Sequence, residues 1–166
     1  RLVRTVVKPF MSAMYPGATL ILTGDPAGVK RSDTDERNTF QEIYDAFKVE
    51  ATPARSNALT ARLGAVESLL MRYLGGNDYG ILVSEDCPMI TKGFRGEYRF
   101  RRIQVVGQDR YTNQPEKNLA SHGHDALQYV AMVVEDSLLS GADSLWLRDD
   151  DDASPKQMPI SWNAFI

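Results

Sequence analysis

The sequence has one cysteine, Cys87, and no long hydrophobic run. A single cysteine excludes an intrachain disulfide, and nothing else indicates an oxidising compartment. No apolar stretch approaches the roughly 18 residues that a membrane-spanning helix requires. No signal peptide is visible either. We therefore expect no membrane among the partners of this protein.

Several common catalytic motifs are also missing. The sequence has no G-x-x-x-x-G-K-[ST] loop, which excludes an ATP site of the Walker type. It has neither a G-x-S-x-G motif nor a Cys–His nucleophile arrangement. The formal net charge is −3, so there is no overall basic field. Any contact with nucleic acid must come from a local basic patch.

The 166 residues, 43% hydrophobic and 25% charged, are ordinary for one globular domain with a core. Buried strands are predicted at 18–23 and 79–83, a short strand at 48–51, and a further strand at 97–106. Helical patterns accompany these strands. The first covers 3–14 and is bent or broken at Pro9, and the second carries Phe40, Ile43, Tyr44 and Phe47 on one side. The third is capped by Ser56 or Asn57 and has Leu59, Leu63, Val66, Leu70 and Tyr73 inward; a short helix at 88–94 and a last one that Ser121 caps follow. This alternation predicts an α/β fold, with 97–113 as an added antiparallel ribbon.

Two acids stand at positions where folds hold ligands. Asp25 directly follows an apolar strand, in Gly24-Asp25-Pro26-Ala27-Gly28, and α/β folds bind ligands at the carboxyl ends of strands. Asp125 follows Ser121 by four residues and lies near the start of a helix. Each acid also has a simpler explanation. Asp25 suits a turn that bonds its own loop backbone, and Asp125 suits the positive end of a helix dipole.

Together, Asp25 and Asp125 offer hard oxygen ligands, which suit Mg²⁺ or Mn²⁺ in a two-metal hydrolysis of a phosphodiester. Two acids are too few for a full two-metal site. The other candidate acids are more typical of caps or solvated loops: Asp33, Asp35, Glu36, Glu85 and Asp86. His122 and His124 flank Asp125 and could bind metal or contact phosphate. Without a third ligand they make a weak zinc signature, and we favour solvent-facing or supporting roles.

Arginines crowd the predicted ribbon, interleaved with aromatic residues. They are Arg95, Arg99, Arg101 and Arg102, with Tyr98 and Phe100 between them. Such a pattern suits a nucleic-acid backbone. It equally suits an exposed strand whose charges discourage aggregation. Arg110 and Lys117 lie before the last helix and could add phosphate contacts.

At these residues the chain resembles the C-terminal nuclease domain of bacteriophage terminase large subunits, from about Gly24 to Tyr129. The order and spacing of several short pieces carry the resemblance: Gly24-Asp25-Pro26-Ala27-Gly28, Arg31-Ser32, Thr34-Asp35-Glu36, Asn57 with Arg62 and Ala65-Val66, Gly80-Ile81-Leu82-Val83-Ser84 with Cys87, Gly96-Glu97-Tyr98-Arg99-Phe100, Pro115-Glu116-Lys117-Asn118, and Ser121-His122 with His124-Asp125-Ala126-Leu127-Gln128-Tyr129.

The resemblance implies a ribonuclease H-like fold, a mixed five-stranded sheet flanked by helices with a β-hairpin extension. It implies a Mg²⁺- or Mn²⁺-dependent endonuclease that cuts concatemeric double-stranded viral DNA during packaging. Asp25 and Asp125 match the family's catalytic, metal-binding acids. Arg99, Arg101, Arg102, Lys117 and His124 are the expected DNA contacts. The implied partners are the terminase small subunit, the portal protein and an upstream ATPase domain of the same polypeptide, in the host cytoplasm.

One departure from the family pattern concerns the first metal-binding acid. In the family this acid sits on the first strand of the sheet, upstream of a helix like 1–15, and we expect this chain to begin after that strand. We expect this chain to be part of a longer polypeptide, with a partial nuclease domain at 1–140 and an acidic, flexible tail at 141–166. Alone, it should cleave DNA poorly or not at all. Two alternatives stay open: a non-catalytic DNA- or portal-binding module on the same fold and, less favoured, a cellular resolvase of the ribonuclease H-like group.

Overall fold

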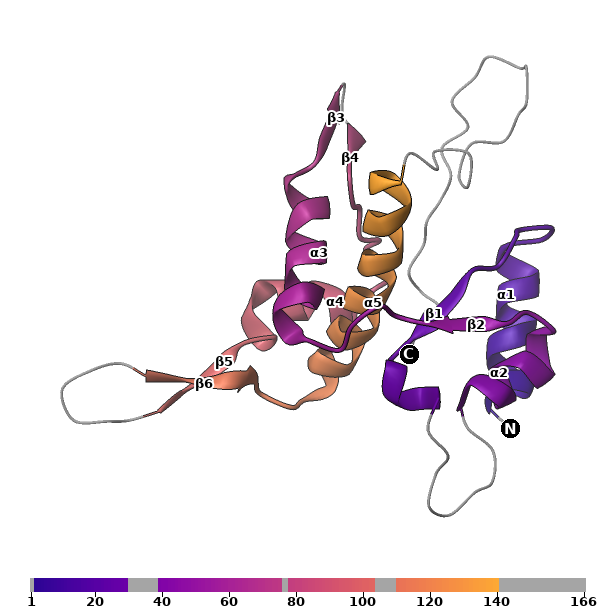
Figure 1. Cartoon of the computed structure of the whole chain (residues 1–166), viewed down its shortest axis with the longest axis horizontal. Helices are drawn as coiled ribbons and strands as arrows, with labels where there is room; N and C mark the ends of the chain where they lie inside the picture. The colour runs from indigo at the N-terminus through magenta and orange to yellow at the C-terminus, as the bar shows by residue number, and fades with distance from the viewer. Residues whose placement is uncertain (1, 30–38, 76–77, 104–109, 141–166) are drawn as a thin grey trace.

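The chain folds into a mixed arrangement of helices and short paired strands (Figure 1). A computed structural model describes residues 2–29, 39–75, 78–103 and 110–140, with the side chains at 74, 75 and 78 left aside. In chain order the elements are η1 (Val3–Val7), α1 (Lys8–Met14), β1 (Leu22–Gly24), η2 (Pro26–Val29), α2 (Thr39–Phe47), β2 (Ala51–Pro53), α3 (Leu59–Met71), β3 (Tyr73–Gly75), β4 (Asp78–Tyr79), α4 (Pro88–Lys92), η3 (Gly93–Glu97), β5 (Phe100–Ile103), β6 (Arg110–Pro115) and α5 (Leu119–Leu139).

A strand–helix–strand unit forms the first part of the fold. β1 and β2 are parallel, with Leu22 opposite Ala51 and Gly24 opposite Pro53. Parallel neighbours need a crossover, and α2 lies within it. The strand predicted at 18–23 is shorter than expected, since only Leu22–Gly24 are paired. These three residues are half-buried. The strand predicted at 48–51 begins later, at Ala51, after Lys48 adopts a positive φ of 60°.

The N-terminal helix accommodates Pro9 by changing from π-helical to α-helical hydrogen bonding just before it. Pro9 lacks the N–H that an α-helix would use at that position. The preceding segment, η1, is a π-helical turn that runs directly into α1, and Pro9 falls in the first turn of α1. The helix is thus continuous rather than broken. Lys8 fixes it to the strand–helix–strand unit by donating from Nζ to the carbonyl oxygen of Ala46, 2.8 Å away.

The core lies where α3 packs against α5, side by side in Figure 1. Its buried members are Ala54, Ala65, Val66, Leu69, Tyr129, Ala131 and Met132. On α3 the inward face is therefore Arg62, Ala65, Val66 and Leu69, a spacing of three, four and seven residues. The predicted inward positions Leu70 and Tyr73 were wrong, since they are 50% and 63% exposed.

A second correction concerns the segment after α3. The helix ends at Met71, because Arg72 is already extended, and β3 turns back onto β4 as a small antiparallel pair. Within the predicted buried strand at 79–83 only Tyr79 belongs to a strand, β4, and Tyr79 and Leu82 are 54% and 65% exposed. Ile81 packs against the core from a segment that is not a strand. An apolar run alone did not distinguish a core strand from a surface segment.

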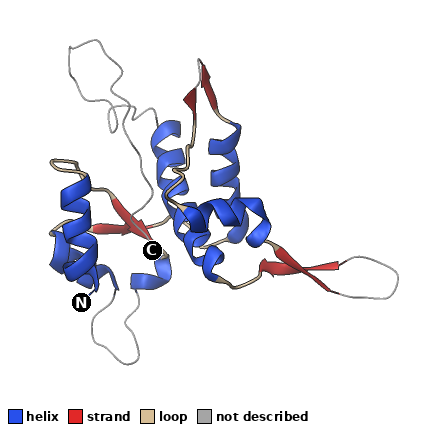
Figure 2. Ribbon diagram, turned by 180° about the vertical axis from the view of Figure 1, so that it is seen from behind, coloured by secondary structure: helices blue, strands red, loops and turns tan. Residues whose placement is uncertain are grey.

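The predicted antiparallel ribbon is present as β5 and β6, and it projects from the body (Figure 1). Viewed from behind, the described strands form three separate pairs among the helices (Figure 2). The short helix predicted at 88–94 is present as α4 and continues into η3. Gly96, inside η3, has a φ of 116°, which favours glycine.

Some predictions fall outside the described residues: the cap at 32–34, the acids Asp33, Asp35 and Glu36, the turn at 107–109 and the tail at 141–166. Among the helices that are described, none has the length and apolar character to span a membrane.

Candidate functional site

Asp25 follows β1, at the carboxyl end of the parallel strand pair. Its backbone carbonyl accepts from the Gly28 N–H at 2.8 Å, and its Oδ1 accepts from the Ala27 N–H, also at 2.8 Å. Asp25 therefore does stabilise the turn that follows β1. The Asp25 side chain nevertheless stays exposed and has a second oxygen with which to interact.

Asp125 lies deeper in its helix than the sequence indicated. The N-cap of α5 is Asn118 rather than Ser121, and the two form a reciprocal capping box. Asn118 Oδ1 accepts from the Ser121 N–H at 2.8 Å, and Ser121 Oγ accepts from the Asn118 N–H at 3.1 Å. Because α5 begins at Leu119, Asp125 occupies its second turn. The helix-dipole explanation weakens there, since the dipole acts mainly within the first turn.

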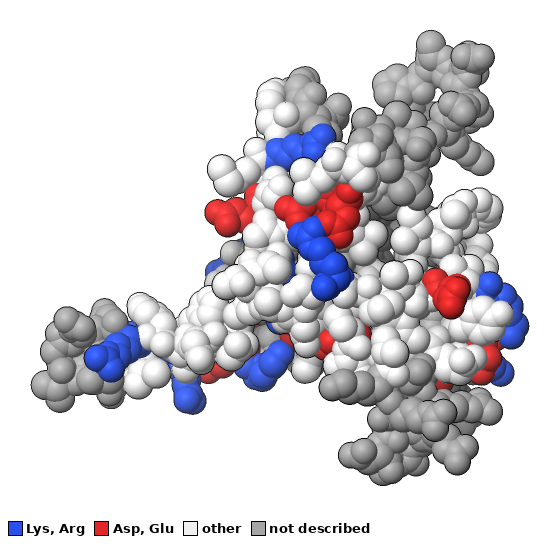
Figure 3. Space-filling view, viewed as in Figure 1, with Lys and Arg blue, Asp and Glu red and all other residues white. Residues whose placement is uncertain are grey.

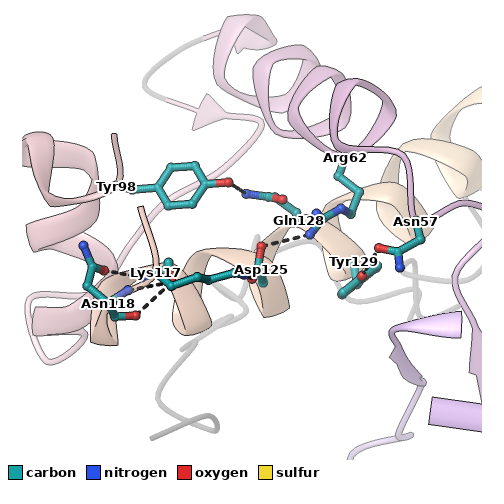
Figure 4. Close-up of polar contacts among 9 residues, drawn as sticks. Asn57, Arg62, Tyr98, Lys117, Asn118, Asp125, Gln128 and Tyr129 are labelled. Atoms are coloured by element: carbon teal, nitrogen blue, oxygen red, sulfur yellow. Dashed lines mark hydrogen bonds and ion pairs between the residues drawn. The ribbon is translucent and has the colours of Figure 1, made fainter. Parts of the chain in front are cut away.

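Two cations hold the Asp125 carboxylate (Figure 4). Arg62 Nη1, from α3, lies 2.9 Å from Oδ1, and Lys117 Nζ lies 2.7 Å from Oδ2. Burial alone would raise the pKa of Asp125. The hydrogen bonds and positive charges of Lys117 and Arg62 outweigh that effect and hold the pKa below its ordinary value. Asp125 is therefore ionised at neutral pH.

Tyr129, one turn further along α5, connects the two predicted acids. Its hydroxyl donates to Asn57 Oδ1 at 2.6 Å. Burial is the main cause that raises the pKa of Tyr129 to about 12. The positive charge of Arg62 opposes this shift, and the negative charges of Asp25 and Asp125 add to it. Arg62 lies over the Tyr129 ring at 5.1 Å from its centre. The fold thus joins the α5 segment that carries Asp125 to the residues that follow the parallel strand pair, where Asp25 lies.

The oxygen donors around Tyr129 have the chemistry that a hard divalent cation requires. Asp25 and Asp125 supply carboxylates, and Asn57 supplies an amide oxygen. Mg²⁺ is typically held by one or two carboxylates together with waters and substrate phosphates, so these residues fit such an ion. Within the described part of the chain, however, no three His, Cys, Asp or Glu side chains form a group that could hold a metal. Two carboxylates and one amide oxygen are therefore the described donors that would hold such an ion.

His124 is a core residue, which corrects its prediction as a DNA contact. It is 4% exposed, and its ring stacks on Tyr98 at 4.9 Å and meets Phe94 edge-on at 4.8 Å. Its Nε2 lies 3.0 Å from the Ile90 carbonyl oxygen. Since a carbonyl can only accept, Nε2 carries the proton. His122, in contrast, is exposed as expected.

The burial of His124 predicts a pH-dependent stability. Burial lowers its pKa, and this outweighs the Ile90 carbonyl and Asp125, which act in the opposite direction. The unfolded chain, with an ordinary pKa of about 6.5, then binds the proton more readily. Stability should therefore fall as pH drops from about 7 through 6.5, with a slope of at most about 1.4 kcal/mol per pH unit.

Chemical denaturation at several pH values between 7.5 and 5.5 measures this slope. His124→Phe should flatten it, and His122→Gln should leave it as it is in the parent. An unchanged slope in His124→Phe would assign the pH dependence to other groups.

The ribbon carries exposed arginines on both strands. Arg99, Arg101, Arg102 and Arg110 are all exposed, as are Phe100 and Tyr111. Lys and Arg follow the projecting arm in the space-filling view (Figure 3). Arg99 Nε is 3.4 Å from Glu116 Oε2, an exposed pair of the kind that contributes little to stability. These side chains can therefore reach a partner.

Three residues of the site were not predicted to be functional: Asn57, Arg62 and Tyr129. Arg62 had a detectable signal, because it lies on the same helical face as Ala65, Val66 and Leu69, and a charge on a core-facing stripe needs a partner. Asn57 follows β2 as Asp25 follows β1, and the Ala54 N–H bonds the Gly24 carbonyl at 3.0 Å beside them. Only strand pairing places Asn57 and Asp25 at the same end of the sheet.

Comparison with models of known families, with curated proteins and with solved structures gave no match for this chain.

Proposed function

We propose that this chain belongs to the nuclease domain of a viral DNA-packaging terminase, and that it takes part in Mg²⁺- or Mn²⁺-dependent cutting of concatemeric double-stranded DNA. The proposal includes a ribonuclease H-like fold and a third acid supplied from outside this sequence. It also includes the portal protein and the terminase small subunit as partners.

One observation carries the proposal. The Tyr129 hydroxyl, one turn from Asp125 on α5, donates to Asn57 Oδ1 at 2.6 Å. Asn57 lies beyond β2, and β2 pairs in parallel with β1, the strand that Asp25 follows. Asn57 is exposed and Lys117 is largely exposed, so the oxygens lie where a DNA phosphate can approach.

Each residue of the site has a separate role in this proposal. Asp25, Asp125 and Asn57 would hold the ion, which when bound activates a water and stabilises the leaving oxygen. Arg62 fixes the Asp125 carboxylate from the buried side. The Tyr129 phenol, with its pKa at about 12, stays protonated at neutral pH, so it can donate to Asn57 and orient that amide.

A plasmid-nicking assay tests the proposal on the natural polypeptide that contains this chain. Nicking should appear with Mn²⁺ or Mg²⁺ and disappear in EDTA. Retention of DNA binding in EDTA, with no nicking under any metal, would instead support the second candidate function.

That second candidate is a non-catalytic DNA- or portal-binding module on the same fold. It is favoured by the cations that already occupy both oxygens of Asp125. It is also favoured by the absence, among the described residues, of a group of three His, Cys, Asp or Glu side chains that could hold a metal. In such a module Asp125 would be a structural anchor, and the ribbon would carry the binding.

The ribbon arginines should contribute sequence-independent affinity in either case. Each phosphate contact adds about 0.9 to the slope of log K against log salt. Replacing Arg99, Arg101 and Arg102 with glutamine should lower that slope by between 1 and 3, as measured by fluorescence anisotropy on a labelled duplex. Arg4→Gln is the matched control, since Arg4 lies on η1, on the opposite side of the molecule from the ribbon (Figure 1). An equal slope in the triple variant would leave these arginines with only an anti-aggregation role.

A further inference from the structure

The two cations on Asp125 differ in how firmly the protein holds them. Both contacts are short, at 2.9 Å for Arg62 and 2.7 Å for Lys117. Their surroundings are opposite. The side chain of Arg62 is 10% exposed, whereas that of Lys117 is 69% exposed. Asp125 therefore has one permanent contact, with buried Arg62, and one exchangeable contact, with exposed Lys117.

Arg62 is the permanent contact. It belongs to the core-facing stripe of α3, and its guanidinium lies over the Tyr129 ring. Withdrawing it would leave a buried charge without its carboxylate, which is costly. Arg62 therefore stays on Oδ1 whatever happens at Oδ2.

Lys117 is the exchangeable contact. It lies between the end of β6 and the start of α5, outside both elements. Its neighbour Asn118 is anchored by the capping box and by a hydrogen bond from its Nδ2 to the Glu97 carbonyl at 2.9 Å. The backbone next to Lys117 is thus held in place, while the long, solvent-exposed side chain of Lys117 extends to Asp125. An exposed lysine–carboxylate pair of this kind is weak and can open without disturbing the fold.

We propose that Lys117 is a displaceable counter-ion, which occupies Asp125 Oδ2 until a divalent cation takes its place. This inference rests on the proposed function, because it assumes that the Asp125 carboxylate is a metal ligand. Once displaced, the Lys117 ammonium lies beside the site and is available to a DNA phosphate. Metal binding would then add positive charge on the side that faces DNA in two ways: the ion brings its own charge, and the released lysine is no longer paired with Asp125.

Lys117→Met tests the exchange, since methionine keeps the length of the side chain and removes the competing charge. Mn²⁺ titration by calorimetry on the natural polypeptide should show about three- to tenfold tighter binding than the parent, because both the competition and the repulsion between cations are gone. Lys92→Met is the matched control. Lys92 is exposed on α4, and its loss should leave Mn²⁺ affinity unchanged.

A second measurement reads the lysine itself. Amine-reactive labelling followed by mass spectrometry should show slow modification of Lys117 without metal and faster modification with Mn²⁺, while Lys92 reacts at one rate. Equal Mn²⁺ affinity in parent and Lys117→Met, or weaker binding in the variant, would overturn this inference and leave the proposed metal site intact. No Mn²⁺ binding in either protein would overturn both.

Discussion

Asp25→Asn should reduce metal-dependent DNA cleavage by at least about 100-fold. Asparagine keeps the Oδ1 acceptor that bonds the Ala27 N–H, so the turn after β1 is preserved. What is lost is the negative charge. Metal ligation and charge stabilisation at such sites contribute several kcal/mol, and each 1.36 kcal/mol is a factor of ten in rate. The initial rate of plasmid nicking with saturating Mn²⁺ measures the change.

This substitution separates the two explanations of Asp25 cleanly. If the acid were only a turn former, asparagine would serve as well and nicking would continue at the parental rate. Asp125→Asn should lose cleavage too, but it also weakens the ion pairs with Arg62 and Lys117, so its stability needs a parallel unfolding measurement. Glu135→Gln is the control. Glu135 pairs with Arg55 at 2.6 Å elsewhere on α5, and its loss should leave nicking unaffected.

Gly93→Ala should destabilise the fold by about 3 kcal/mol, at the upper end of the usual cost of overpacking. An added Cβ at Gly93 would overlap the His124 imidazole. A side chain at the surface would swing aside, but this ring is held between Phe94 and Tyr98 and bonded to the Ile90 carbonyl. The midpoint of urea unfolding, followed by circular dichroism, measures the loss.

Two further variants give this prediction its control and its mechanism. Gly64 lies in the middle of α3 with open space around it, so Gly64→Ala should stabilise the protein by up to about 1 kcal/mol through helix propensity alone. In a His124→Ala background, Gly93→Ala should cost much less, because the clashing ring is gone. An undiminished cost in that background would place the clash elsewhere.

Local patterns predicted most of the elements but not their orientation. The helices containing Phe40, Leu63 and Leu127 are where periodicity placed them. The inward face of α3 was shifted, because Leu63 and Leu70 fit one helical stripe as well as Arg62 and Leu69 fit another. Only packing against α5 selects between the two stripes. The strand at 79–83 was overextended, since an apolar run does not indicate whether another element will cover it.

For the site, the sequence by itself determined the two acids and their local settings, because a carboxylate after an apolar strand or inside an amphipathic helix is a property of neighbouring residues. The tertiary structure decided what those acids contact. Arg62 reaches Asp125 only because α3 packs on α5, and Asn57 lies at the same end of the strand pair as Asp25 only because β2 pairs with β1. His124 became a core ring and Lys117 a counter-ion for the same reason: contacts across tens of residues depend on how the elements pack, which neither spacing nor composition records.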